Sequence, residues 1–148
     1  MKKLLLAVIV SLTITSLNAQ NVVNLTVMGN SYTVSKVFPP EIIGEYTYEG
    51  NGGSPKVFLK DDGTGYFQPH DVAPVGIKFW IDCEPNGEWR KQVGGNGRYQ
   101  YTLVIQYQEG GTNKNYEYGK YDLLGVMIQP DMGRVSILGE RYKPLKKQ

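Results

Sequence analysis

Residues 98–108, with the sequence RYQYTLVIQYQ, form the clearest alternating stretch of the chain. One side of the alternation carries aromatic and aliphatic side chains, namely Tyr99, Tyr101, Leu103, Ile105 and Tyr107. The other side is mostly polar. Successive side chains of a β-strand point to opposite faces, so a period of two predicts a strand with one buried face. Few segments of the chain show the apolar spacing of a helix, and we therefore expect an all-β protein.

Shorter alternating stretches cover most of the remaining chain and are separated by turn residues. The chain has 148 residues, of which 18 are glycine and 8 are proline. Glycine and asparagine accept the positive backbone φ of tight turns, and DDGTG at 61–65 and PNG at 85–87 are strong turn signals. The expected strands of the main body are 42–48, 57–60, 66–68, 77–84, 88–92, 98–108, 116–129 (as one strand or two) and 135–142.

Short strands joined by local turns predict that sequence neighbours pair antiparallel. The economical architecture is an up-and-down barrel of about eight strands, because closure removes the exposed edges of an open sheet. A β-sandwich is the alternative, with the loop at 69–76 as the one candidate for a long crossover. An additional hairpin is expected at 22–37, with its turn at Gly29-Asn30, followed by a linker at Phe38-Pro39-Pro40.

The first residues have the features of a secretory signal peptide. Lys2 and Lys3 precede a short apolar run, and small and polar residues lead to a cleavage site after Ala19. The expected organisation is a signal peptide at 1–19, the hairpin and linker at 20–40, and the barrel domain at 41–148. The mature protein would then reside in a bacterial periplasm or outside the cell, without a membrane span.

Composition excludes some classes of function. The chain has 16 basic and 14 acidic residues, and removing the two lysines of the signal peptide leaves a mature chain of zero net charge. A neutral domain lacks the basic footprint of a nucleic-acid-binding protein. The single cysteine, Cys83, cannot form an internal disulfide and is expected to be buried.

No constellation of catalytic residues stands out. His70 is the only histidine, and the chain has no Gly-x-Ser-x-Gly motif to accompany it in a hydrolase. The carboxylates of Glu41, Glu45 and Glu49, like those of Glu84 and Glu88, are interpreted as solvated. We therefore expect a protein that is not an enzyme, with no metal site and no cofactor.

Two short motifs resemble those of the lipocalin-like calycin barrels. In that family a Gly-x-Trp on the first barrel strand packs under an arginine of the last strand. Here Gly44-Glu45-Tyr46 begins the main body, with tyrosine in place of tryptophan, and Arg141 lies near its end. The resemblance implies an eight-stranded barrel that encloses one small ligand, with Gly44 and Arg141 as structural residues that close its base.

Tyrosine is more frequent than phenylalanine, at 11 residues against 4. A tyrosine-lined interior suits a cavity that holds a ligand, since every buried hydroxyl needs a partner. The leading hypothesis is therefore a secreted binding protein with a small apolar or aromatic ligand held by Tyr46, Phe79, Tyr99, Tyr101 and Tyr107. The alternative is an interaction module with a filled core, of the inhibitor or immunity type. It would bind an envelope or extracellular protein through loops and an exposed patch of Trp80 and Trp89.

Overall fold

The computed structural model describes residues 21–48, 56–68, 73–108, 116–137 and 140–144, and every structural statement below concerns these residues. The predicted signal peptide and His70 lie outside them. Side chains are described up to residue 137, except that of Tyr48. Within this part of the chain, no helix is long and apolar enough to cross a membrane.

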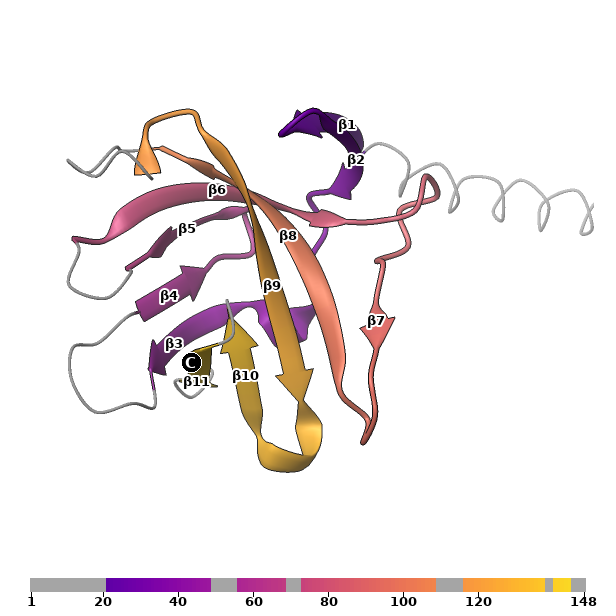
Figure 1. Ribbon diagram of the computed structural model, residues 1–148, viewed down its shortest axis with the longest axis vertical. Helices are drawn as coiled ribbons and strands as arrows, with labels where there is room; N and C mark the ends of the chain where they lie inside the picture. Colours follow the sequence, from indigo (N-terminus) through magenta and orange to yellow (C-terminus); the bar gives the residue numbers. More distant parts are fainter. Residues whose placement is uncertain (1–20, 49–55, 69–72, 109–115, 138–139, 145–148) are drawn as a thin grey trace, which may run out of the picture.

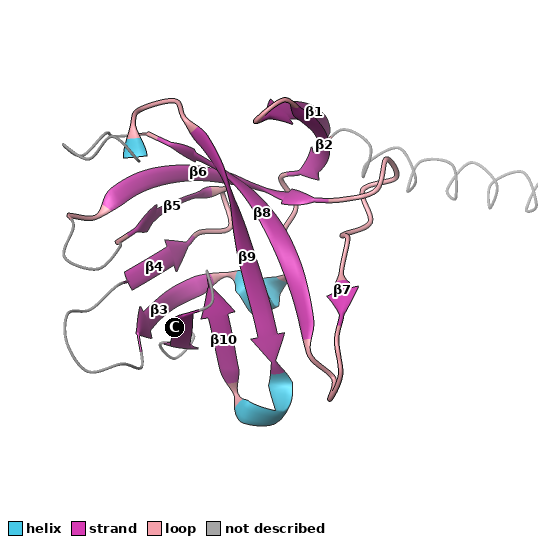
Figure 2. Cartoon of the chain, viewed as in Figure 1, coloured by secondary structure: helices cyan, strands magenta, loops and turns pink. Residues whose placement is uncertain are grey.

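The described chain is an all-β structure, as the alternation predicts (Figure 1). Its strands are β1 (Val22–Val27), β2 (Asn30–Ser35), β3 (Gly44–Tyr48), β4 (Lys56–Leu59), β5 (Thr64–Phe67), β6 (Val75–Asp82), β7 (Gln92–Val93), β8 (Tyr99–Tyr107), β9 (Tyr121–Gln129), β10 (Arg134–Ile137) and β11 (Glu140–Pro144). Two short 3-10 helices, η1 (Pro40–Ile42) and η3 (Pro130–Met132), precede β3 and β10 and are cyan in Figure 2.

All of these strands belong to one antiparallel sheet that curls around its buried face (Figure 1). Sequence neighbours pair from β3 to β6 and from β8 to β11. Two further pairings join these groups, since β6 pairs with β8 and β11 pairs with β3. The observed pairing is the local, antiparallel kind that the turn signals predict. The described strands form a single sheet, whereas the alternative of a β-sandwich would have two facing sheets.

Several strand boundaries differ from the sequence predictions. The segment expected as one closing strand at 135–142 is a hairpin of two strands, β10 and β11. The stretch at 88–92 contains an isolated bridge between Trp89 and Cys83, and only its last residue, Gln92, belongs to a strand, the two-residue β7. The tract at 116–129, predicted as one strand or two, contains the single strand β9, and Tyr116, which precedes β9, is in 3-10 helical conformation.

The main core lies on the inner face of the curled sheet. It contains the buried face of β8 together with alternate residues of the neighbouring strands: Ile42, Tyr46, Val57, Leu59, Phe67, Val75, Ile77, Phe79, Ile81, Tyr101, Leu103, Ile105, Tyr107, Leu124, Val126, Ile128, Val135 and Ile137. Tyr101, Leu103, Ile105 and Tyr107 thus share one face of β8, as the alternation predicts, and the structure shows that this face is buried. Cys83 is also buried, as expected.

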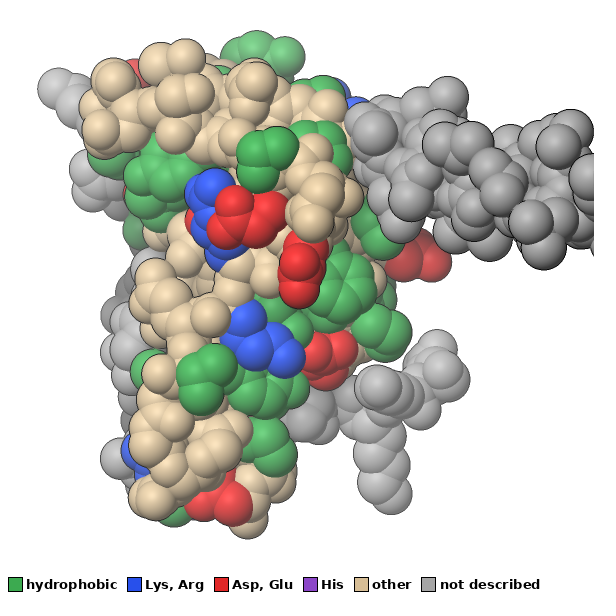
Figure 3. Space-filling model, turned by 90° about the vertical axis from the view of Figure 1, so that its right-hand side faces the viewer, with side chains coloured by type: hydrophobic (Ala, Val, Ile, Leu, Met, Phe, Trp, Pro, Cys, Tyr) green, Lys and Arg blue, Asp and Glu red, His purple; other side chains and the backbone are tan. Residues whose placement is uncertain are grey.

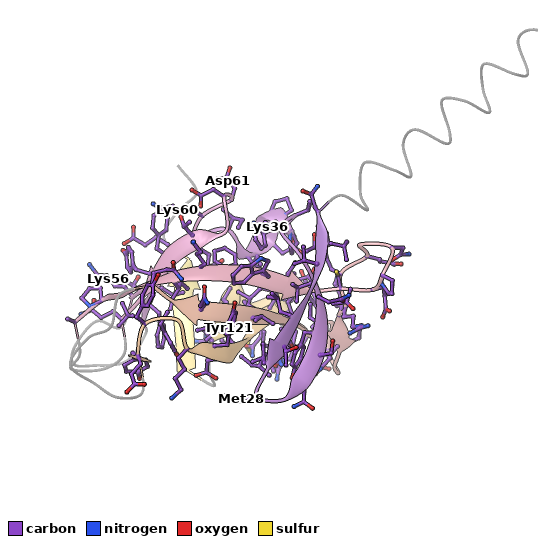
Figure 4. The ribbon with its side chains drawn as sticks, turned by 90° about the horizontal axis from the view of Figure 1, so that it is seen from above. Met28, Lys36, Lys56, Lys60, Asp61 and Tyr121 are labelled. Atoms are coloured by element: carbon purple, nitrogen blue, oxygen red, sulfur yellow. The ribbon has the colours of Figure 1, made fainter. Side chains whose placement is uncertain are left out.

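The N-terminal hairpin covers a second core on the outer face of the sheet. Trp80 and Val104, whose side chains point away from the main core, are buried with Val27 and Val34 of the hairpin. β2 also pairs with the end of β6. The hairpin is therefore built onto the sheet, and Figure 4 shows it from above with Met28 at its tip. Its turn is Met28-Gly29, both at positive φ, rather than the predicted Gly29-Asn30.

The segment predicted as a linker packs against the main core instead. The ring of Phe38 lies 4.6 Å from that of Phe79, centroid to centroid, and Pro39 is buried. Trp89 Nε1 donates a hydrogen bond of 2.9 Å to the carbonyl oxygen of Val37. Proline stiffens the chain here, and the apolar side chains on either side of it anchor the segment across one end of the sheet.

Gly65 provides a test of the β4–β5 register. It pairs with Leu59, and a Cβ at this position would run into the carbonyl oxygen of Phe58. We predict that Gly65→Ala lowers the free energy of unfolding by about 3 kcal/mol or more, because the clash is with backbone that cannot rotate away. Urea denaturation of the parent protein and the variant measures this change in the free energy of unfolding. The matched control is Gly95→Ala, where a Cβ meets nothing within 4 Å, and an equal loss in both variants would contradict the register.

Candidate functional site

A carboxylate surrounded by tyrosines lies at one end of the main core. The hydroxyl of Tyr101 donates a hydrogen bond of 2.7 Å to Glu41 Oε1. The hydroxyl of Tyr46 donates to the main-chain oxygen of the same residue at 3.3 Å. The side chains of Tyr46 and Tyr101 are each about 1% exposed, so Glu41 satisfies two phenols that are cut off from water.

Local structure places Glu41 at this point. Pro40 is the first residue of η1, where its missing N–H costs no hydrogen bond, and Ile42 is fully buried in the main core. Glu41 lies between them and is half-buried. Gly44 then begins β3 at φ +149°, a conformation that favours glycine, and turns the chain toward Tyr46.

Lys91 brings a positive charge to the same tyrosines. Its ammonium nitrogen lies 4.2 Å from the ring centroid of Tyr99 and 5.5 Å from that of Tyr101. The two rings meet edge to face, with centroids 5.7 Å apart and planes at 82°. Both ammonium distances are within the range of cation–π attraction. We call Glu41, Tyr46, Tyr99, Tyr101 and Lys91 the tyrosine–carboxylate cluster.

The electrostatics of the cluster hold its phenols in the neutral form. Burial raises the pKa of Tyr46 and of Tyr101 well above the ordinary value, and the nearby Glu41 carboxylate raises both further. The same two causes raise the pKa of Tyr99. A phenolate beside the half-buried carboxylate of Glu41 would place two negative charges together, so these tyrosines stay protonated and can donate hydrogen bonds.

A second, smaller group of aromatic residues lies farther along β8. The hydroxyl of Tyr107 donates to Asp122 Oδ2 at 3.3 Å, and the ring of Tyr116 packs edge to face on that of Tyr107 with centroids 5.3 Å apart. Burial and Asp122 together raise the pKa of Tyr107. Tyr101 and Tyr107 are six residues apart, which is about 20 Å along a strand.

The five side chains predicted to hold a ligand all belong to the main core or contact it. Tyr46, Phe79, Tyr101 and Tyr107 are buried members, and Tyr99 is half-buried against them. The structure brings Tyr46, Tyr99 and Tyr101 together at Glu41 but places Tyr107 in the second aromatic group, with Phe79 packed between β8 and Phe38. The side chain of Arg141 lies outside the described part, so its predicted contact with Tyr46 stays a prediction.

The sequence does not reveal the place of Glu41 or Lys91 in the cluster: its pattern predicts a solvated Glu41 and gives no role to Lys91. One signal for Glu41 was present, since it directly follows Pro39-Pro40 and precedes the apolar Ile42-Ile43. Lys91 carried no signal because its contact joins the loop before β7 to β8. The exposed tryptophan patch is also not observed: Trp80 is buried in the second core, and Trp89 is half-buried against the main core.

Several other carboxylates of the described chain form contacts near the surface. Arg90 bridges Asp82 at 3.1 Å and Glu84 at 2.9 Å. Tyr66 donates to Glu45 Oε1 at 2.9 Å on the outer face. Glu49 lies outside the described residues, and among those that are described no three histidine, cysteine or acidic side chains are grouped so as to hold a metal ion.

Comparisons of the chain with protein-family models, with curated proteins and with solved structures give no match. The geometry of the tyrosine–carboxylate cluster therefore carries the functional argument.

The hydrogen bond between Tyr101 and Glu41 is predicted to stabilise the fold. Tyr101→Phe removes the donor and leaves Glu41 Oε1 half-buried without it, so we expect the free energy of unfolding to fall by about 1–3 kcal/mol. Tyr66→Phe removes a similar bond on the outer face, where water replaces it, and should cost less. Urea denaturation of both variants tests this, and a larger loss for Tyr66→Phe would contradict it.

Alkaline pH should unfold the protein through its buried tyrosines. The pKa values of Tyr46, Tyr101 and Tyr107 are raised in the folded state, so the unfolded state releases their protons first as the pH rises above about 10. Stability is therefore unaffected by these groups below that pH and falls above it. Absorbance at 295 nm should show these three phenols ionising only together with the loss of structure recorded by circular dichroism. Their ionisation in a folded protein would contradict the assignment.

Proposed function

We propose that the chain is a secreted, non-enzymatic binding protein with a closed, eight-stranded, lipocalin-like barrel, and that it holds a small apolar or aromatic ligand at the tyrosine–carboxylate cluster. The barrel is supported by the pairings that lead from β3 through β6 and β8 to β11 and back to β3. Gly44-Glu45-Tyr46 at the start of β3 supports the resemblance.

The unused bonding capacity of the cluster carries the proposal. Oε2 of Glu41 makes no hydrogen bond to any described residue, although Oε1 is bound by Tyr101. Lys91 makes ring contacts but no ion pair of 4 Å or less with a described acid. Oε2 is not among the described buried side-chain atoms that lack a hydrogen-bond partner, so solvent reaches it, and it can accept a hydrogen bond from a bound polar group.

The position of the cluster also favours ligand binding at this end rather than deeper. The interior between Tyr101 and Tyr107 is occupied by packed apolar side chains, including Phe79, Leu103 and Ile105. The hydroxyl of Tyr107 is already bonded to Asp122. Tyr99 is the half-buried tyrosine of the cluster, so a ligand can reach its ring from the side on which Lys91 is exposed.

A second candidate function rests on β7. This strand pairs only with β8, and residues 91–97 are all exposed, with Val93 at 78%. An open strand edge with an exposed apolar side chain can pair with an added strand of another protein. This observation favours the interaction module, with β7 rather than the tryptophans as its contact surface.

Native mass spectrometry of the mature protein, purified from its own host, tests the proposed function. We expect a mass excess over the chain that begins after Ala19, and its loss under denaturing conditions. Tyr99→Ala, produced in the same way, should carry much less of the added mass because Tyr99 is the accessible ring of the cluster.

The matched control is Tyr66→Ala, which alters an outer-face tyrosine and should retain the excess. A native mass equal to the bare chain would contradict ligand binding at the cluster. A native mass that contains a second protein would favour the interaction module instead.

A further inference from the structure

We propose that the ligand of the tyrosine–carboxylate cluster carries an ammonium group, and that Lys91 occupies the ammonium position in the free protein. The inference rests on the proposed function and adds the chemical class of its ligand. The relevant side of the molecule, which carries β7, faces the viewer in Figure 3 and shows basic side chains beside acidic and hydrophobic ones.

The first argument is that the site already holds an ammonium group. Lys91 Nζ lies over the ring of Tyr99 at 4.2 Å and within 5.5 Å of the centroid of Tyr101. Because the two ring planes stand at 82°, a single cation contacts two differently oriented aromatic walls. Aromatic walls of this kind recognise quaternary and substituted ammonium ligands.

The second argument is the charge of the surroundings. Glu41 accepts the hydroxyl proton of Tyr101 at 2.7 Å, and its negative charge acts on Tyr46, Tyr99 and Tyr101, raising the pKa of each. A carboxylate at this position attracts a cation and repels an anion. The free Oε2 of Glu41 can also accept a hydrogen bond from an ammonium or hydroxyl group of the ligand.

The third argument is that Lys91 is easily displaced. Its side chain is exposed, it forms no ion pair with a described acid within 4 Å, and it precedes a strand of only two residues. An ammonium on a long flexible chain is strongly hydrated and loses rotamer freedom when it is held. A quaternary ammonium ligand brings apolar substituents to the rings and is less hydrated, so it can replace Lys91.

Nuclear magnetic resonance of the whole mature protein tests this with choline as the probe. The ε-methylene protons of Lys91 should resonate upfield of ordinary lysine because the adjoining Nζ lies 4.2 Å from the ring centroid of Tyr99. Choline chloride at constant ionic strength should shift them saturably toward the ordinary position. The neutral isostere 3,3-dimethyl-1-butanol has the same shape without the charge and should not.

Variants distinguish binding at the tyrosine–carboxylate cluster from nonspecific binding elsewhere on the surface. Lys91→Ala removes the competing ammonium and should tighten choline binding two- to fivefold, which corresponds to a cation–π contact of about 0.5–1 kcal/mol. Tyr99→Leu should abolish binding, whereas Tyr99→Phe keeps the ring and should retain it. Lys60→Ala is the matched control, because Lys60 lies 5.5 Å from the ring of Phe58, beside the exposed Asp61 turn (Figure 4), and should leave binding unchanged.

The inference is overturned if choline produces no saturable shift in either the parent protein or Lys91→Ala, or if the neutral isostere binds equally well. Toluene, titrated in parallel, then separates the two proposals. Saturable shifts of Tyr99 and Tyr101 with toluene would preserve the ligand-binding function with a different ligand class. Binding of neither probe would count against the proposed function as well.

Discussion

Buried phenols that must find hydrogen-bond partners constrain this structure more than any other feature. Strand β8 places Tyr101 and Tyr107 on the inner face of the sheet, where water cannot reach their hydroxyls. Each hydroxyl is satisfied by a carboxylate from another segment, Glu41 before β3 and Asp122 on β9. An unsatisfied buried hydroxyl would offset much of the free energy gained by burying its ring. These two bonds therefore favour the packing of the Glu41 segment and of β9 against β8.

This constraint explains why the segment before β3 is ordered against the core. Residues 38–43 combine proline stiffness with the apolar anchors Phe38 and Ile42, and they present Glu41 to β8. The same segment receives the indole hydrogen bond of Trp89 at Val37. One end of the sheet is thereby covered by a segment that also places the Glu41 carboxylate beside the tyrosines.

The N-terminal hairpin makes the sheet asymmetric. Over Trp80 and Val104 the outer face is buried beneath the hairpin, whereas elsewhere it carries half-buried polar residues such as Gln106. Two open edges remain among the described strands, at β1 and at β7. The β1 edge belongs to a six-residue strand, whereas β7 has only two residues and directly follows Lys91, so contacts at β7 and at the tyrosine–carboxylate cluster would be coupled.

The sequence by itself determined the all-β class, the long strand at 98–108, most of the other strands, the turn at 61–65 and the burial of Cys83. These properties follow from alternation and turn chemistry, which depend on residues close together in the chain. Tertiary structure alone decided which face of Trp80 is covered, the direct pairing of β6 with β8, and the contact of Lys91 and Glu41 with the tyrosines of β8. Glu41 and Tyr101 are 60 residues apart. Alternation shows which side chains share a face, but the partner of each buried hydroxyl depends on how distant segments pack.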